Sequence, residues 1–208
     1  MTFKSLSGAL PGGIDKAFLH LWKSSLLVDG AYYEFGVYTG YSLYYAEKAS
    51  KAIRGPEFMF YGFDSFRGLP EPRVDIMWAE GDYAVSREET ESNLAGAGTD
   101  MSKVVLVEGF YSRGLFEEFW RGHQKTPALV LIDCDLFESC YEVLSFFGHK
   151  FVPGTVVMFD EFNGMEYGEK FALERFEKRF PLFKKRHLFS YGKFGEVFEV
   201  THATSGDH

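Results

Sequence analysis

The chain has 208 residues, a formal net charge of −8 and a hydrophobic content of 46%. That length suits one domain (1–208) of α/β type with a packed core and excludes two full domains, and the hydrophobic content excludes a disordered chain. The acidic balance and the absence of a Lys/Arg run argue against a nucleic-acid partner, because such binding depends on neutralised phosphates. The start of the chain lacks the apolar core of a signal peptide, and no segment has the length of a membrane span. We therefore expect a cytoplasmic protein without a membrane partner.

Helices and strands are expected to alternate along the chain. A loose leader at 1–13 ends in the breaker Pro11-Gly12-Gly13, and Asp15 is expected to cap the first helix. The predicted helices cover 14–28, 40–55, 86–97, 112–122, 137–147 and 170–180. The predicted strands cover 31–35, 57–63, 104–107, 128–132, 155–159, 185–190 and 196–201, before a tail at 202–208.

This alternation predicts a doubly wound, mostly parallel seven-stranded sheet with helices on both faces. The last two strands have little between them, which predicts one antiparallel edge strand. The stretch 65–86 is a long loop rich in Gly and Pro, and loops of that length inside a domain are usually functional. We expect its part from Arg67 to Ser86 to order over a bound cofactor as a flap.

The stretch from Ala31 to Ser42, AYYEFGVYTGYS, joins a strand, a glycine-rich turn and the start of a helix. Gly36 and Gly40 allow positive φ and close backbone approach in the turn, and Ser42 is expected to cap the helix. Together with Glu34 at the end of the strand, they predict a pocket for a polar ligand beside a helix N-terminus. On this stretch alone, a plain βα turn is an equally good interpretation.

Acidic residues close five predicted strands in succession. Ligands of doubly wound sheets bind beyond the carboxyl ends of the strands, so these side chains are expected to face a shared site. Clustered carboxylates cost stability unless a cation or ligand hydroxyls offset their repulsion. The five residues are Glu34, Asp64, Glu108, Asp133 and Asp160.

The glycine turn has the pattern E-x-G-x-x-x-G and lacks the nicotinamide fingerprint G-x-G-x-x-G, which weakens the hypothesis of a nicotinamide oxidoreductase. It is close to the first motif of class I S-adenosylmethionine methyltransferases, with Tyr38 where the middle glycine usually stands. Asp64 follows the second strand and is placed to accept hydrogen bonds from both ribose hydroxyls of a nucleoside. Its alternative role is the cap of a loop or helix.

Longer segments extend this similarity. The segments GFDSFRGLPEP (62–72), GDYAVSREETESNL, VVLVEGFYSRGL, LIDCDLFESCYEVL and PGTVVMFDEF occur in the order and spacing found in macrocin O-methyltransferases. From about Tyr33 to Asn163 the chain therefore resembles this family, whose members methylate sugar hydroxyls on macrolides and related natural products. The resemblance implies a class I methyltransferase fold, which is Rossmann-like, and an S-adenosylmethionine cofactor.

The residues that the resemblance assigns to the cofactor fall into three groups. The glycine turn would line the methionine end, the end of the second strand would hold the ribose, and the end of the third strand would lie against the adenine. The groups are Glu34, Gly36, Tyr38, Gly40 and Ser42; Asp64 and Ser65; and Gly109 and Phe110.

The resemblance matches Asp133, Asp160 and Glu161 to the family's divalent-metal carboxylates, although members usually carry Asp-Asp where this chain has Asp160-Glu161. Oxygen donors at adjacent strand ends suit a hard cation such as Mg²⁺. The cation would lower the pKa of a bound hydroxyl, and Asp133 would accept the proton as general base. Leu136 stands where catechol-type relatives have a lysine, which favours the carboxylate base. The alternative is that Asp133 and Asp135 only cap a helix and hold a loop.

Several further residues are considered for the site. Cys134 and Cys140 are expected to be reduced packing residues, and no histidine falls near the predicted acids. Four aromatic residues are candidates for a wall that stacks on adenine or a sugar, with a core role equally open for each. They are Trp78, Tyr83, Phe110 and Tyr111.

The leading hypothesis is an S-adenosylmethionine-dependent O-methyltransferase, assisted by Mg²⁺, that acts on a hydroxyl of a sugar or small natural product. A second hypothesis is a protein of the same fold that binds the cofactor and has lost catalysis, and the glutamate at position 161 motivates it. The stretch before the glycine turn is shorter than in typical family members. The acceptor and the oligomeric state, a homodimer among the options, therefore stay open.

Overall fold

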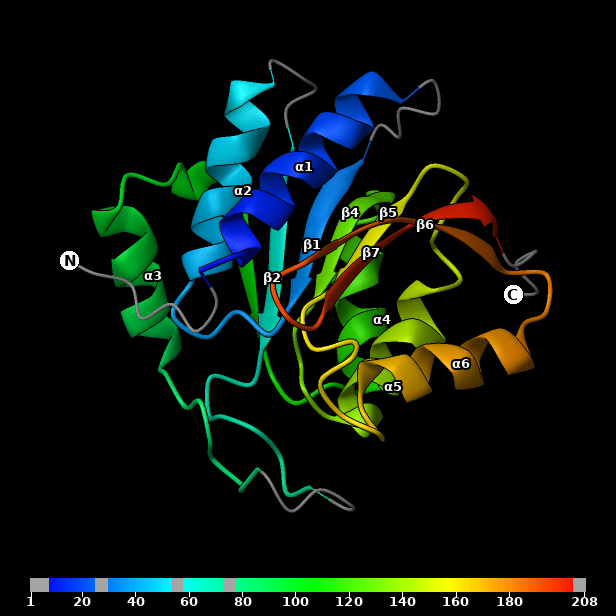
Figure 1. Ribbon diagram of the computed structural model, residues 1–208. Helices are drawn as coiled ribbons and strands as arrows, with labels where there is room; N and C mark the ends of the chain where they lie inside the picture. The colour runs from blue at the N-terminus through cyan, green and yellow to red at the C-terminus, as the bar shows by residue number, and fades with distance from the viewer. Residues whose placement is uncertain (1–7, 25–29, 54–57, 73–77, 204–208) are drawn as a thin grey trace.

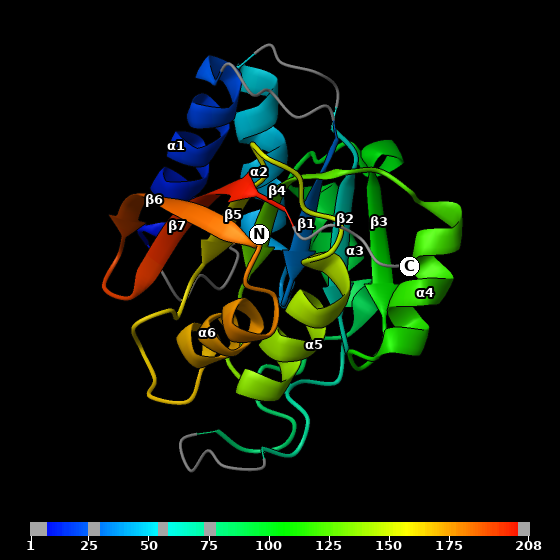
Figure 2. The same cartoon turned by 90° about the vertical axis from the view of Figure 1, so that its right-hand side faces the viewer.

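The computed structural model describes residues 8–24, 30–53, 58–72 and 78–203. Within them, seven strands form one sheet with the order β3-β2-β1-β4-β5-β7-β6 (Figure 1; β3 is labelled in Figure 2). The strands are β1 (Ala31–Phe35), β2 (Phe60–Asp64), β3 (Val104–Glu108), β4 (Pro127–Ile132), β5 (Val156–Phe159), β6 (Lys184–Tyr191) and β7 (Gly195–His202). The helices are α1 (Leu10–Lys23), α2 (Tyr41–Ala52), α3 (Arg87–Gly96), α4 (Arg113–Gly122), α5 (Phe137–Phe147), α6 (Glu169–Arg179) and the short 3-10 helix η1 (Met101–Lys103).

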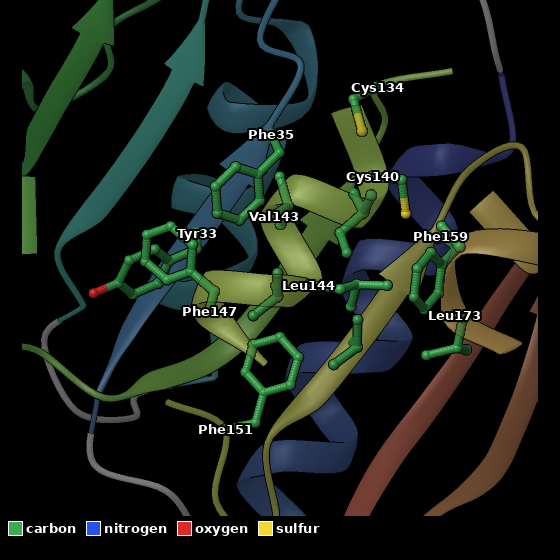
Figure 3. Close-up of a cluster of buried hydrophobic side chains, with 14 of the residues drawn as sticks. Tyr33, Phe35, Cys134, Cys140, Val143, Leu144, Phe147, Phe151, Phe159 and Leu173 are labelled. Carbon is green, nitrogen blue, oxygen red and sulfur yellow. The ribbon is translucent and has the colours of Figure 1, made fainter. Parts of the chain in front are cut away.

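Helices cover both faces of the sheet (Figure 2). The side chains of α1, α2 and α3 pack on one face, and those of α4, α5 and α6 pack on the other. Figure 3 shows part of the second layer, where Phe35 of β1 lies beside Phe147 of α5 with ring centroids 5.0 Å apart. Both layers are apolar, as expected for a parallel sheet that is buried on its two faces.

The strands β1 to β5 are all parallel, which confirms the predicted doubly wound sheet. Their carboxyl ends therefore lie along one edge of the sheet. Antiparallel pairing occurs at one side, as the sequence predicted: β7 pairs antiparallel with both β5 and β6, and β6 is the outermost strand. The antiparallel strand thus lies one position in from the edge.

The first helix starts earlier than predicted. It begins at Leu10, so Pro11 lies in its first turn, the glycines at 12 and 13 are helical, and Asp15 is not its cap. Proline is tolerated in a first turn because the amide groups there have no partner within the helix. Gly13 is not a breaker but a packing residue, since a Cβ at that position would lie 2.9 Å from the Tyr191 ring.

Elsewhere the predicted boundaries differ from the observed ones mainly at helix ends. Helix α3 starts where a helix was predicted, and Ser86 is its cap, because its hydroxyl accepts a hydrogen bond from the Glu89 amide at 3.2 Å. The predicted ends of the first two helices, at 25–28 and at 54–55, fall outside the described residues. None of the described helices combines the length and the apolar character needed to cross a bilayer.

Candidate active site

A cavity of about 670 Å³ opens at the carboxyl ends of the parallel strands. Its walls are the β1–α2 turn, the loops after β2, β3, β4 and β5, the first turns of α5, and Leu10 of α1. The volume lies in the range of small-molecule sites, and doubly wound sheets bind their ligands at this edge.

Most of the predicted cofactor residues line this cavity, and so do all three predicted metal ligands. Two of the predicted residues, Glu34 and Gly40, are not among the lining residues. The cofactor residues that line it are Gly36, Tyr38, Ser42, Asp64, Ser65, Gly109 and Phe110.

At two points the glycine turn has a backbone conformation and surroundings that suit glycine and leave no ready space for a Cβ atom. Gly36 has φ of 94°, and a Cβ there would overlap the carbonyl oxygen of Asp133. Gly40 has φ of 86°, and a Cβ would lie 2.9 Å from Leu94. Gly40, and not Ser42, is the N-cap of α2, so its role is to shape the turn from outside the cavity. Tyr38 also has a positive φ, of 50°, at the position where the class I motif usually has a glycine.

Asp64 ties this turn to the end of β2. Its Oδ2 accepts hydrogen bonds from the backbone amides of Val37 at 2.8 Å and Tyr38 at 2.9 Å, and its Oδ1 accepts one from Phe66 at 2.8 Å. The carboxylate therefore caps two loops while it also lines the cavity. The two roles proposed for Asp64 are compatible, because a carboxylate has about four acceptor positions.

Helix α3 holds the turn from the other side, which the sequence did not reveal. Thr90 Oγ1 donates a hydrogen bond to the carbonyl oxygen of Tyr38 at 2.6 Å, and Asn93 Nδ2 donates one to that of Thr39 at 3.3 Å. These contacts join residues more than 50 positions apart. Since Thr and Asn side chains in a helix usually have no long-range partner, no pattern in the sequence would have predicted these two bonds.

Glu34 lies behind the wall of the cavity, contrary to the predicted contact with the cofactor. It falls on the face of β1 that α2 covers, and its side chain is wholly buried. The Tyr32 hydroxyl donates to its Oε2 at 2.5 Å, and the Ser42 hydroxyl donates to its Oε1 at 2.7 Å. Burial raises the pKa of Glu34 to about 8. Glu34 therefore supports the turn through Ser42, which does line the cavity.

Acidic side chains gather where β4 and β5 end. Asp133, Asp135, Asp160 and Glu161 all line the cavity. Burial, and then the charges of Asp160 and Asp135, raise the pKa of Asp133 well above its usual range. Burial also raises the pKa of Asp160 and of Glu161. The grouping of carboxylates expected from the sequence is therefore present at this end of the sheet, with strong mutual repulsion.

The donor chemistry of this group suits a hard cation, because carboxylate oxygens are the ligands that Mg²⁺ prefers. The side chains are not arranged as a ready ligand set, however. Among the described residues, no three His, Cys, Asp or Glu side chains are close enough to hold a metal ion as they stand. Glu161 is one reason why these side chains do not form a ligand set, because its Oε2 lies against Gly164 of its own loop.

Glu169, the first residue of α6, is a buried carboxyl that the sequence analysis missed. Its Oε2 accepts a hydrogen bond from the Glu161 amide at 3.1 Å, and its Oε1 has no hydrogen-bond partner within the described part of the chain. Burial, followed by the charges of Cys134 and Asp133, raises its pKa well above the usual range. Glu169 is therefore a positioning residue for the loop that carries Glu161. The sequence feature that could have indicated Glu169 is an acidic residue at the start of a helix.

The loop after β2 forms one side of the cavity. Its two limbs are paired by backbone hydrogen bonds between Leu69 and Asp82 and between Gly81 and Leu69. Trp78 Nε1 donates to Met165 Sδ at 3.3 Å, and the Tyr83 ring lies 5.7 Å from that of Tyr38. The loop thus reaches from the glycine turn to the β5–α6 loop. Its closing movement stays a prediction, and residues 73–77 of it lie outside the described part.

The four aromatic candidates all line the cavity, on two sides. Trp78 and Tyr83 belong to the loop after β2, with ring centroids 5.2 Å apart. Phe110 and Tyr111 follow β3, and they differ from each other: Phe110 is 46% exposed, while the Tyr111 hydroxyl donates to the carbonyl oxygen of Phe63 at 3.0 Å. Phe110 is therefore free to cover a planar ligand, and Tyr111 also belongs to the core.

Glu108 does not join the other strand-end acids. It is exposed, its closest cationic partner is Arg67 at 3.8 Å, and it does not line the cavity. Its strand β3 lies at the outer edge of the sheet, which turns the side chain to solvent. Cys134 and Cys140 are both buried, as expected for packing residues, and the structure has them as free thiols.

Comparison with known protein families identifies the family of this chain. A model of the family described as Macrocin-O-methyltransferase (TylF) matches residues 24–182, which is most of the chain. The chain belongs to the macrocin O-methyltransferase family. Membership of the macrocin O-methyltransferase family makes it an O-methyltransferase and implies S-adenosylmethionine as its methyl donor. It also counts against the alternative of a nicotinamide oxidoreductase.

Solved structures of O-methyltransferases share the fold seen in this member of the macrocin O-methyltransferase family. The O-methyltransferase NovP has a TM-score of 0.73 at 20% identity, over 92% of this chain and 79% of NovP. The calicheamicin methyltransferase CalS11 has a TM-score of 0.73 at 24% identity, over 91% of this chain and 77% of CalS11. TomG from Streptomyces achromogenes, solved with S-adenosylmethionine, has a TM-score of 0.57 at 17% identity, over 91% of this chain and 80% of TomG. No curated protein matches the chain.

Proposed function

We propose that this protein transfers the methyl group of S-adenosylmethionine to a hydroxyl of a sugar or small natural product, assisted by a divalent cation such as Mg²⁺. The observation that carries the proposal is that Asp64 and Asp133 line one cavity beside the glycine turn. Asp64 would bind a nucleoside, and Asp133 would face the reacting hydroxyl. CalS11 is described as a TDP-rhamnose 3'-O-methyltransferase and TomG as an enzyme of tomaymycin synthesis, which supports a small-molecule acceptor.

The cofactor would lie along the strand ends in the order of its chemical parts. The methionine end would contact the turn at Gly36 and Tyr38, and Asp64 would accept hydrogen bonds from the ribose. Phe110, nearly half exposed at the end of β3, would cover the adenine. This order follows the lining of the cavity from β1 to β3 and uses only residues that face it.

The reaction would take place at the ends of β4 and β5. Methyl transfer requires the hydroxyl oxygen in line with the bond between sulfur and the methyl carbon, so positioning supplies much of the rate. Asp133 would accept the hydroxyl proton as general base. Leu136 and the flap residue Trp78 would exclude water beside it.

A cation fits the chemistry of this end of the cavity, although the side chains would have to turn to bind it. Asp133, Asp160 and Glu161 would hold it through carboxylate oxygens, and their repulsion would fall. When bound, the cation would lower the pKa of the acceptor hydroxyl. The Glu169 carboxyl would keep the Glu161 backbone in place as that side chain turns.

The direct test incubates the full chain with S-adenosylmethionine, Mg²⁺ and a panel of sugar-bearing natural products. Formation of S-adenosylhomocysteine that depends on an acceptor supports the proposal. Asp133→Asn is expected to lower kcat at least a hundredfold with little change in cofactor affinity. Glu108→Gln is the matched control, because that acid closes a strand but faces solvent. Equal rates for wild type and Asp133→Asn would contradict the role of Asp133.

A further inference from the structure

Two arginines of α6 do not line the cavity themselves but contact Tyr141, a partly exposed residue of its wall, and this edge is called the mouth of the cavity. Tyr141 of α5 lines the cavity, and the Arg175 guanidinium carbon lies 6.0 Å from the centre of its ring. Arg179 Nη1 lies 3.5 Å from the Tyr141 hydroxyl oxygen. The hydrogen bond from Arg179 lowers the pKa of Tyr141. Both arginines are exposed to solvent.

Helix stability does not explain this pair. Arg87 and Arg113, on α3 and α4, each form a salt bridge with a glutamate four residues later. Arg175 instead has Arg179 four residues later, and like charges at that spacing destabilise a helix. Neither arginine forms a salt bridge with a carboxylate in the described part of the chain. The helix dipole favours Arg179 in the last turn but not Arg175 one turn earlier.

The surroundings of Tyr141 suit a planar group. The Phe137 ring lies 5.6 Å from the Tyr141 ring at an angle of 15°, and 5.3 Å from the Phe171 ring. Phe137 also lines the cavity, close to the acids at the end of β4. From Phe137 to Tyr141 the helix rises about 6 Å, so Tyr141 and the arginines on it lie roughly one helical turn along α5 from the reacting end. One extended molecule can therefore reach both.

We propose that Arg175 and Arg179, together with Tyr141, form an oxyanion-binding subsite at the mouth of the cavity, so that the methyl acceptor carries a phosphate or carboxylate group. The inference rests on the proposed function, since it assigns the outer part of the same cavity. Guanidinium groups bind both oxyanions through paired N–H donors, and an anion between the two arginines would remove their repulsion. Glu138 and Glu142 line the same mouth and oppose an anion, so the arginines must outweigh them.

The experiment titrates the full chain, saturated with S-adenosylhomocysteine, with uridine 5′-diphosphate, benzoate and neutral uridine in a calorimeter. The test variant is the double change Arg175→Gln with Arg179→Gln. The matched control is Lys170→Gln with Lys178→Gln, which removes the same charge from exposed positions of the same helix. Tyr141→Phe removes the hydroxyl and keeps the ring.

We expect wild type to bind uridine 5′-diphosphate or benzoate at least tenfold more tightly than uridine, and the anion that binds identifies a phosphate or a carboxylate acceptor. The arginine variant should lose at least tenfold in that affinity, Tyr141→Phe less, and the lysine control little. Unchanged affinity for S-adenosylhomocysteine in each variant shows that the cofactor site is intact. The inference is overturned if wild type binds S-adenosylhomocysteine but neither anion, or if the lysine control loses as much. It is also overturned if the arginine variant lowers the melting temperature without affecting anion binding, because the pair would then only join α5 to α6.

Discussion

The Cα of Gly36 lies so close to the carbonyl oxygen of Asp133 that a Cβ on the glycine would overlap it. The contact is held in register by two backbone hydrogen bonds, from the Asp133 amide to the Phe35 carbonyl oxygen and from the Gly36 amide to that of Phe63. The turn that would hold the cofactor and the strand end that carries the proposed base are thus joined through their backbones. A change at Gly36 should therefore disturb binding and chemistry together.

Gly36→Ala is expected to destabilise the protein by more than about 3 kcal/mol, because the new Cβ meets backbone and φ is positive. Affinity for S-adenosylhomocysteine should fall with it. Gly114→Ala is the control, since a Cβ at that position in α4 meets nothing within 4 Å. That control should gain up to about 1 kcal/mol. Thermal unfolding of the two variants measures both effects, and equal melting temperatures would contradict the close contact.

Asp64→Asn should weaken binding of S-adenosylhomocysteine about 10- to 100-fold, because charge-assisted hydrogen bonds contribute about 1.5–3 kcal/mol each. The amide would also put a donor where the carboxylate accepts from Val37 or Tyr38. Titration calorimetry gives the affinity, with Glu108→Gln as the solvent-exposed control. If Asp64→Asn bound the ligand as tightly as wild type, Asp64 would only hold the loops.

The Thr90 side chain gives a separate test of the support from α3. Thr90→Val keeps the shape but leaves the Tyr38 carbonyl oxygen without its 2.6 Å partner, which should cost about 1–3 kcal/mol of stability. Affinity for S-adenosylhomocysteine should fall about 5- to 10-fold as the turn loosens. Thr90→Ser retains the hydroxyl and should bind as wild type does. Equal affinity in the valine and serine variants would show that α3 does not position the turn.

Much of this arrangement could be predicted from the sequence because it depends on local patterns. The alternation of apolar strands with helices predicted the parallel sheet, and parallel strands bring their carboxyl ends to one edge. That rule correctly placed Asp64, Asp133 and Asp160 around the cavity. The glycines at 36 and 40 likewise indicated positive φ, which the structure shows at both.

The errors came from properties that depend on the whole fold. Glu34 closes a strand as predicted, but the pleat points its side chain under α2, and strand position alone does not say whether a side chain reaches the cavity or is buried beneath a helix. Glu108 closes a strand at the outer edge of the sheet, where the side chain meets solvent. Pro11 predicted a break in the chain, but proline is also common in the first turn of a helix. The bonds from Thr90 and Asn93 depend on long-range packing that no local pattern encodes.

The buried Glu34 predicts a dependence of stability on pH. Its pKa is about 8 in the folded protein, against a reference value of 4.5. The stabilising contribution of its proton is complete below about 4.5 and is lost as pH rises towards 8, because the unfolded chain ionises first. Within that pH window the free energy of unfolding falls, through Glu34, by at most about 1.4 kcal/mol per pH unit.

The variant Glu34→Gln has no carboxyl to ionise at this position and so lacks this pH dependence. The free energy of unfolding of the variant should therefore rise relative to that of wild type as pH goes from 5 to 9. Denaturant unfolding of the two proteins at several pH values measures the difference, which cancels the shared contributions of the other buried acids. Parallel stability profiles for the two proteins would show that Glu34 is ionised in the fold as readily as in the unfolded chain.

The most direct test of the cofactor site is hydrogen–deuterium exchange of the wild-type chain with and without S-adenosylhomocysteine. Bound ligand should slow exchange in peptides that cover residues 36–42, 64–69 and 109–111, while peptides from β6 and β7 stay unchanged. Unchanged exchange at the strand ends under a saturating excess of ligand, or protection confined to other parts of the chain, would contradict the account.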